Sequence, residues 1–233
     1  MEPTKEQIEA YRLDGFVVVE SFLSQDEVER DREAYTRSFA HDWETGLRPD
    51  EVNYQPDVTP ADMTRQLCNV WKADRTLAAT VLAARNGRFG ALLAGEPGMR
   101  LIQDNAVWKP PSGKALLCHQ DAAYAGWLEP ANMTTCWMAL DDTSADAGTI
   151  YYLRGSNHWP HFPLGGSFHA PADWLGYVNE VKPEGAEIDL VPIEVPAGGA
   201  AFHDGWTFHG SRPTTGSPPF ERGRRIDAPP SLR

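Results

Sequence analysis

A run of short, strand-like segments after Gly98 constrains the fold of this chain more than any other feature. The segments are rich in β-branched and aromatic residues, and they read MRLIQDNAVWK, ALLCH, MTTCWMAL, TIYYL, IDLVPIEV, AAFH and TFHGS. Turn residues separate them, in stretches such as PPSGK, DDTSADAG, RGSNHWP and PAGG. This pattern predicts an antiparallel sandwich or barrel over residues 99–233.

The first 98 residues differ in character and predict helices. Thr4 with Gln7 and Ser24 with Glu27 have the spacing of capping boxes, and Gly15 is placed to end the first helix. The sequence FVVVE between these two helices predicts a buried strand.

Two further helices are predicted from TPADMTRQL and TLAATVLAAR, whereas residues 41–58 have no clear period and predict a loop. Nothing resembles a linker or an internal repeat, so we expect one domain over residues 1–233, with a mostly helical part at 1–98. Residues 160–186 are too long for a hairpin turn. They fit either a lid or binding loop, or a solvated surface excursion.

Composition narrows the class of partner. The net charge of −12 argues against a nucleic acid and disfavours an anionic membrane, and no apolar run approaches the length of a membrane span. The first residues are polar and acidic, unlike a signal peptide. Cys68, Cys118 and Cys136 form no CxxC pair, so we expect free thiols in a reducing cytoplasm.

The stretch CHQDAAY places His119 and Asp121 two residues apart, directly after an apolar run. Residues two apart in an extended segment point to the same face, so the two side chains can converge. Removing such groups from water is costly, and a hydrogen-bonded ion pair, remaining solvent or a metal ion could each offset that cost. A metal needs a third ligand, and His203 and His209 in AAFHDGWTFHGSRP are the candidates. Two histidines and one carboxylate form the facial triad of non-haem Fe(II) oxygenases.

Three stretches together carry a family resemblance: HQDAAY, then TTCWMALDDTSADAGTIYYLRGSNHWP, then GGAAFHDGWTFHGSRPTTGS followed by arginines. They resemble the phytanoyl-CoA dioxygenase family, whose members are Fe(II)- and 2-oxoglutarate-dependent hydroxylases. The opening EQIEAYRLDGFVVVESFLSQDEV is similar as well, so the resemblance spans nearly the whole chain. It implies a mainly β fold, with a double-stranded β-helix (jelly-roll) core at 99–233 and flanking N-terminal α-helices.

The resemblance also implies roles for individual residues. His119, Asp121 and His209 would hold the iron, with His209 chosen over His203 because HGSRP matches the family's distal histidine element. Arg224 would clamp the remote carboxylate of 2-oxoglutarate, with Arg222 and Arg225 as alternatives, since a guanidinium pairs a carboxylate bidentately. The resemblance also places four residues near the cofactor: Thr134, Trp137, Gln103 and Lys109. Trp137 fits a core position equally well.

The sequence departs from the family pattern in two places. RGSNH stands where the family has PGSH, and the chain stops at IDAPPSLR where the arginine strand normally continues. The second departure bears on the arginine assignment, because two prolines disfavour a long final strand.

The implied reaction uses Fe(II), 2-oxoglutarate and O2, and it releases succinate and CO2 while a small-molecule metabolite is hydroxylated. Related halogenases lack the carboxylate, so Asp121 favours hydroxylation, although desaturation and cyclisation begin with the same hydrogen abstraction. Two other functions would also use the ligands: a metal-binding jelly-roll module without turnover, and a metal-assisted hydrolase. Neither requires a carboxylate clamp.

Overall fold

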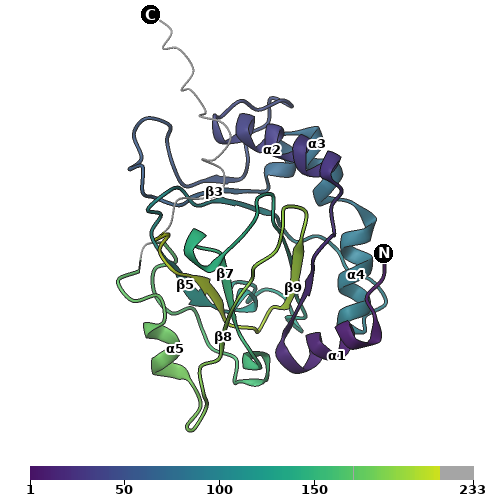
Figure 1. Cartoon of the computed structure of the whole chain (residues 1–233), viewed down its shortest axis with the longest axis vertical. Helices are drawn as coiled ribbons and strands as arrows, with labels where there is room; N and C mark the ends of the chain where they lie inside the picture. Colours follow the sequence, from purple (N-terminus) through teal and green to yellow (C-terminus); the bar gives the residue numbers. More distant parts are fainter. Residues whose placement is uncertain (170, 216–233) are drawn as a thin grey trace, which may run out of the picture.

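The computed structural model describes residues 1–169 and 171–215 as three antiparallel sheets with helices around them (Figure 1). One sheet has the order β1-β9-β6, from strands Phe16–Val19, Ala200–Asp204 and Thr134–Met138. The second has the order β5-β10-β7-β8, from Leu116–His119, His209–Ser211, Ile150–Leu153 and Leu190–Pro192. The third has the order β2-β3-β4, from Glu51–Val52, Arg65–Cys68 and Asn105–Trp108.

Both predicted capping boxes are present. In α1, Lys5–Asp14, the Thr4 hydroxyl accepts from the Gln7 amide while the Gln7 side chain accepts from the Thr4 amide, and Gly15 ends the helix in the left-handed region with φ of 84°. Ser24 and Glu27 make the same reciprocal pair ahead of α2, Gln25–Phe39. Short 3-10 helices cover Val70–Lys72, Asp121–Tyr124, Ala145–Ala147 and Ser156–His158.

The helices predicted after residue 58 needed correction. TPADMTRQL is not a helix: its last three residues form β3 together with Cys68, and β3 pairs with β4 from Arg65 opposite Trp108 to Cys68 opposite Asn105. TLAATVLAAR is two helices, α3 at Arg75–Val81 and α4 at Ala84–Ala94. Asn86, in the first turn of α4, donates its side-chain amide to the carbonyls of Thr80 and Val81 and so caps the end of α3.

The β1-β9-β6 sheet and the β5-β10-β7-β8 sheet face each other across a shared core. Phe16 and Ala201 from the β1-β9-β6 sheet pack with Tyr152 from the other sheet and with Ile193 and Val195 beyond β8. Antiparallel sheets accompanied by helices are therefore confirmed. The predicted predominance of strand is not, because helix makes up 29% of the structure and strand 18%. The strands are shorter than the sequence pattern predicted, and the remaining residues of the predicted segments lie in the connections between strands.

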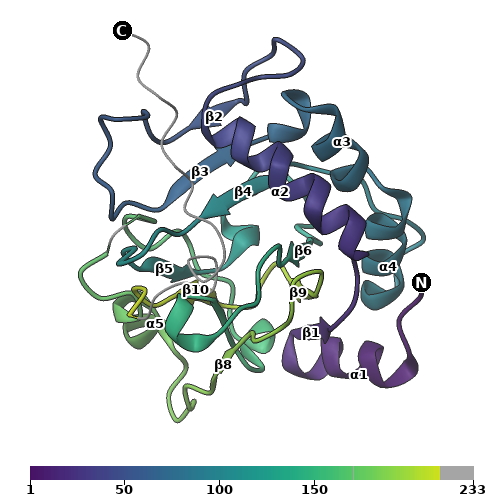
Figure 2. The same ribbon diagram turned by 45° about the horizontal axis from the view of Figure 1, so that its top comes forward.

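The small β2-β3-β4 sheet packs against α2 and α3, which lie beside it in Figure 2. Ala34 from α2, Leu77 from α3, Leu67 from β3 and Ala106 from β4 share one buried cluster. That cluster fixes one face of β3 and β4 against the helices, so the alternate residues Gln66 and Asn105 are left on the other face.

Residues 160–186 lie along the free edge of β5, and they contain α5, Gly176–Val181. The Leu117 amide donates to the carbonyl of Phe168 over 3.0 Å, and the Cys118 amide donates to the carbonyl of Trp174 over 2.9 Å. Val178 is fully buried in the cluster beneath. Of the two interpretations of this segment, a solvated excursion is therefore wrong, because the segment is docked onto the strand that carries His119.

Cys68, Cys118 and Cys136 are all free thiols. Across residues 1–169 and 171–215, no helix combines the length and apolarity needed to cross a membrane.

Candidate metal centre

Two neighbouring strands and the turn after one of them bring His119, Asp121 and His209 together. His119 ends β5 and lies directly opposite His209 in the antiparallel pairing with β10. Asp121 begins the 3-10 turn that follows β5. One ligand atom from each residue lies within 4.8 Å of the other two, and both histidines are buried.

Backbone carbonyls fix the tautomer of both histidines. His119 Nδ1 lies 2.8 Å from the carbonyl of Leu117, and His209 Nδ1 lies 3.0 Å from the carbonyl of Thr207. A carbonyl can only accept, so each Nδ1 carries the hydrogen and each neutral Nε2 presents a lone pair. These two nitrogens lie 3.3 and 3.4 Å from the same oxygen, Asp121 Oδ1. Three lone pairs therefore converge on one point.

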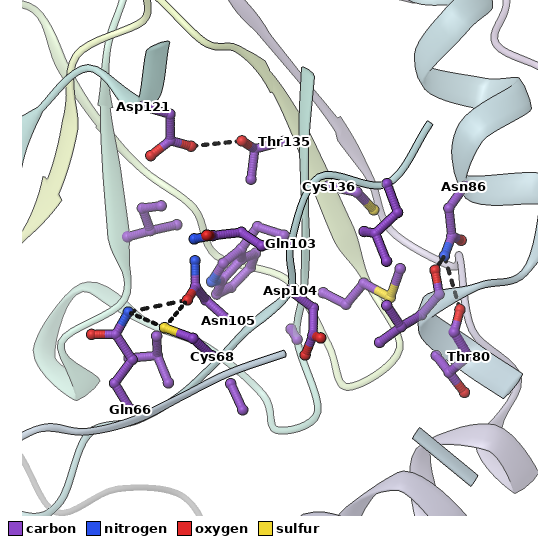
Figure 3. Close-up of a pocket in the computed structure, with 18 of the residues that line it drawn as sticks. Gln66, Cys68, Thr80, Asn86, Gln103, Asp104, Asn105, Asp121, Thr135 and Cys136 are labelled. Atoms are coloured by element: carbon purple, nitrogen blue, oxygen red, sulfur yellow. Dashed lines mark hydrogen bonds between the residues drawn. The ribbon is translucent and has the colours of Figure 1, made fainter. Parts of the chain in front are cut away.

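The second oxygen of Asp121 is held by the protein. Thr135 donates to Oδ2 over 2.6 Å, a hydrogen bond drawn in Figure 3, and His203 Nε2 lies 3.1 Å from the same atom. His203 Nδ1 in turn lies 2.9 Å from the hydroxyl of Tyr152. With Nε2 donating to the carboxylate, Nδ1 accepts from that hydroxyl. His203 thus contacts the outer oxygen of Asp121, whereas His209 lies in the ligand set with His119 and Asp121.

Burial and mutual charge set the protonation of these groups. Burial opposes the charge of Asp121, but the imidazoles, His209 above all, outweigh it and hold the pKa of that carboxyl well below its usual range. Burial lowers the pKa of His119, and it lowers the pKa of His203 to about 4. At His209 burial also lowers the pKa, but the Asp121 charge outweighs it and the pKa is raised. Burial therefore favours the neutral form of His119 and His203, whereas Asp121 favours a positive charge that a protonated His209 or a metal ion bound at its Nε2 would supply.

The donor set fits a divalent metal ion. The distances of 3.3 and 3.4 Å from the two Nε2 atoms to Asp121 Oδ1 are longer than the about 2.7–2.9 Å of a charge-assisted hydrogen bond. A cation between the three atoms supplies the attraction that facing lone pairs lack. Two imidazoles and one carboxylate on one side leave the opposite positions free, which is the arrangement suited to Fe(II).

Aromatic rings border the centre. The ring of Phe168, from the docked segment 160–186, lies 5.0 Å from the ring of His119 between centroids. The ring of Tyr124 lies 5.6 Å from it, and both rings are nearly perpendicular to the imidazole. Both line the same cavity as His119, Asp121 and His209. Phe168 and His169 of the docked segment therefore line one side of the site.

The predicted cofactor residues on β6 lie on opposite faces of the strand. The Thr134 hydroxyl is hydrogen-bonded to that of Tyr11 over 2.7 Å, on the face turned to α1 and α4, although Thr134 also borders the cavity. Thr135 and Trp137 share the other face. Trp137 packs into the core between the sheets and also borders the cavity.

Gln103 and Lys109, predicted to lie near the cofactor, both line the cavity that contains the metal centre. Lys109 Nζ donates to the hydroxyl of Ser211 over 2.6 Å and to the carbonyl of Arg212, and burial lowers the pKa of this lysine to about 8. Ser211 follows His209 by two positions in β10 and so shares its face. The three candidate arginines, Arg222, Arg224 and Arg225, lie outside the described residues.

Sequence reasoning missed two supporting side chains, Thr135 and Gln120. Gln120, between the two ligands in sequence, is 2% exposed. Its amide nitrogen donates to the carbonyl of Trp206 over 2.7 Å, and its oxygen accepts from the amide of Phe162 over 3.1 Å. It thereby ties β5 to the turn before β10 and to the start of the docked segment. The signal available in the sequence was the alternation of faces, which sends Gln120 away from the metal and into the protein.

Comparisons with known proteins agree with this geometry. The model of the phytanoyl-CoA dioxygenase (PhyH) family matches residues 11–219. The peroxisomal phytanoyl-CoA dioxygenase of Mus musculus is 23% identical over 223 residues, which cover 89% of this chain and 63% of the mouse protein. This chain therefore spans less than two thirds of that relative's length.

Solved structures share the fold. SnoK, a non-haem α-ketoglutarate-dependent carbocyclase from nogalamycin biosynthesis, superposes with a TM-score of 0.72 at 23% identity, covering 92% of this chain and 80% of SnoK. The epimerase SnoN, in complex with Fe3+, α-ketoglutarate and nogalamycin RO, gives a TM-score of 0.68 at 22% identity, covering 91% of this chain and 78% of SnoN. On the family match, the fold and the triad together, the chain belongs to the phytanoyl-CoA dioxygenase family of Fe(II)/2-oxoglutarate oxygenases.

Proposed function

We propose that this protein uses Fe(II), 2-oxoglutarate and O2 to hydroxylate a small-molecule metabolite, with release of succinate and CO2. The observation that carries the proposal is the convergence of His119 Nε2, His209 Nε2 and Asp121 Oδ1 with their lone pairs facing inward. Family membership and the iron and α-ketoglutarate in the SnoN complex support it. We further propose that the two facing sheets form a jelly-roll core.

Each protein group around the proposed iron has a distinct task. His119 and His209 would bind through Nε2. Their Nδ1–H bonds to backbone carbonyls fix the orientation of the rings and keep that tautomer. Asp121 would bind through Oδ1, because Oδ2 is taken by Thr135 and His203. Two donors on the outer oxygen fix the orientation of the carboxylate and favour its charged form.

When bound, iron and 2-oxoglutarate would supply an oxidant, made from dioxygen, that removes a hydrogen atom from the substrate. Lys109, held by Ser211 beside the His209 strand, is placed to attract a carboxylate of 2-oxoglutarate, and Trp137 borders the same cavity. Arg224 keeps its proposed role as the clamp on the remote carboxylate. Phe168 and Tyr124 restrict the approach of water to His119.

The reaction outcome is tested by the mass of the product and by succinate formation. Protein loaded with Fe(II) and supplied with 2-oxoglutarate in air should form succinate at a slow basal rate, and a panel of metabolites should reveal one that accelerates it. One added oxygen atom in that metabolite supports hydroxylation. Loss of two hydrogen atoms would mean desaturation or ring closure, and an unchanged mass would mean epimerisation, so either overturns the proposed outcome. Absence of succinate formation with bound iron would favour a binding module or a hydrolase.

A further inference from the structure

Across the cavity from Asp121 and Thr135, β3, β4 and the segment before β4 present a surface of side-chain amides. We call Gln66, Gln103 and Asn105, together with the thiol of Cys68, the amide wall. All four line the cavity that contains the metal centre. In the view of Figure 3 the amides of Gln103 and Asn105 lie below Asp121 and Thr135, with the space of the pocket between them.

The orientation of Asn105 is fixed by two donors. Its Oδ1 accepts from Gln66 Nε2 over 3.2 Å and from the Cys68 thiol over 2.9 Å. Burial raises the pKa of Cys68 to about 12, so the thiol keeps its hydrogen. In this arrangement the Asn105 oxygen faces the two donors, so its nitrogen points away from them. Figure 3 shows it directed into the pocket.

Gln103 and Asn105 are exposed and Gln66 is half-buried, and each has polar atoms that no protein group binds in the described part of the chain. Within residues 1–169 and 171–215, no hydrogen bond from Asn105 Nδ2 to another protein group is present, and the same holds for the Gln66 oxygen and for the whole amide of Gln103. The free groups are donors and acceptors in a mixture, and none is charged. Such a surface matches hydroxyl, ether and carbonyl groups.

The wall residues themselves carry no positive charge. Arg65, next to Gln66 on β3, has its guanidinium over the ring of Trp108, 4.6 Å from the centroid. Lys109 is held by Ser211, and in the proposed function it attracts a carboxylate of 2-oxoglutarate. A phosphate or carboxylate group of the substrate therefore meets no cation among the wall residues, and the net charge of −12 opposes such anions further.

Aromatic residues complete the recognition surface. Tyr124, beside His119, and Trp127 both line the cavity and are 48% and 71% exposed, which is high for large aromatic side chains. Ring compounds that carry many oxygens have polar edges and apolar faces. The amide wall suits the edges, and the two aromatic side chains suit the faces.

We propose that the substrate of this enzyme is a neutral, oxygen-rich ring compound of the glycoside type, hydrogen-bonded by Asn105, Gln66 and Gln103. The proposal rests on the proposed oxygenase function, because it concerns the same cavity. It excludes coenzyme A thioesters as the preferred substrates, even though the family takes its name from one.

Ligand-observed NMR on the protein loaded with Fe(II) and 2-oxoglutarate, under nitrogen, tests the proposal with two probes, methyl β-glucoside and hexanoyl-coenzyme A. The glucoside should bind saturably at millimolar concentration and the thioester should bind more weakly. Asn105→Ala should weaken glucoside binding about five- to tenfold, the effect of one lost hydrogen bond. Gln25→Ala is the matched control, because Gln25 is an exposed amide outside the cavity, and it should change nothing.

Three results would overturn the proposal: no saturable glucoside binding, tighter binding of the thioester, or glucoside binding that Asn105→Ala leaves unchanged. Basal succinate formation in air separates this failure from failure of the oxygenase function. If the protein forms succinate but does not bind the glucoside through Asn105, only the substrate class is wrong. If it forms no succinate, the oxygenase function is wrong as well.

Discussion

The metal centre and the amide wall face each other across one cavity, and they differ in how many of their polar atoms have hydrogen-bond partners in the protein. Around the metal centre each ligand side chain has a further protein partner: a backbone carbonyl for His119 and for His209, and Thr135 with His203 for Asp121. On the wall, Asn105 has its oxygen fixed and its nitrogen free. Hydrogen bonds thus fix the geometry where one ion must be held, and are left open where an organic molecule is to be bound.

The largest expected effect comes from removing a ligand. His119→Ala should abolish succinate formation and lower Fe(II) affinity by more than the about 10–100-fold that follows loss of an outer partner. Iron content after dialysis, together with succinate assays, measures both. His158→Ala is the control, because His158 lies in the 3-10 helix Ser156–His158 and does not line the cavity. Equal iron content in the two variants would remove His119 from the centre.

Arg224→Ala should act on 2-oxoglutarate alone. Loss of a charge-assisted bidentate pair from an enclosed carboxylate costs about 2–5 kcal/mol, or about 30-fold to a few thousandfold in binding. Titration of 2-oxoglutarate against the variant gives the shift, and its iron content should match that of the wild type. An unchanged titration would move the clamp to Arg222 or Arg225.

Adjacent threonines on β6 allow a sharper test of the centre. Thr135→Val removes the hydroxyl that donates to Asp121 Oδ2 at nearly constant volume, and it should weaken Fe(II) binding about 10–100-fold. Thr134→Val is the matched control, since that hydroxyl is bonded to Tyr11 on the other face. Competition with a metal chelator measures both affinities. Equal losses of Fe(II) affinity in the two variants would show that Thr135 does not support the metal centre through Asp121.

Gln120→Leu should act on stability first. It leaves the Trp206 carbonyl and the Phe162 amide without their partner inside the protein, and an unsatisfied buried group costs about 1–3 kcal/mol. We expect the free energy of unfolding to fall by about 2–4 kcal/mol in denaturant titrations. Gln25→Leu, at an exposed glutamine, should change it by less than about 0.5 kcal/mol. A loss no larger than in that control would show that Gln120 does not hold the docked segment.

The sequence predicted the triad better than its surroundings. The two-residue spacing of His119 and Asp121 has one geometric meaning in an extended segment, so it could be interpreted without a structure. Whether Thr134 or Thr135 faces the metal depends on the register of β6 with β9, where Thr135 lies opposite His203. A shift of one residue reverses every face, and nothing local in TTCW decides it.

In the N-terminal part of the chain, too, local signals were predicted correctly and long-range pairing was not. Capping boxes are local signals, and both predicted ones are present. Residues 65–68 have a helix-forming composition, yet they pair with a strand about forty residues later in the chain, and that long-range pairing overrides the local preference. The amide wall depends on this strand, so the sequence alone could not have indicated it.

The most direct test of the metal centre is an anaerobic titration of Fe(II) with 2-oxoglutarate, followed by the weak visible charge-transfer band of the complex. The wild-type protein should develop the band, and His209→Ala should not, because it lacks a ligand. His203→Ala should still develop it, because His203 contacts only the outer oxygen of Asp121. A band that persists in His209→Ala and disappears in His203→Ala would contradict the assignment of the triad.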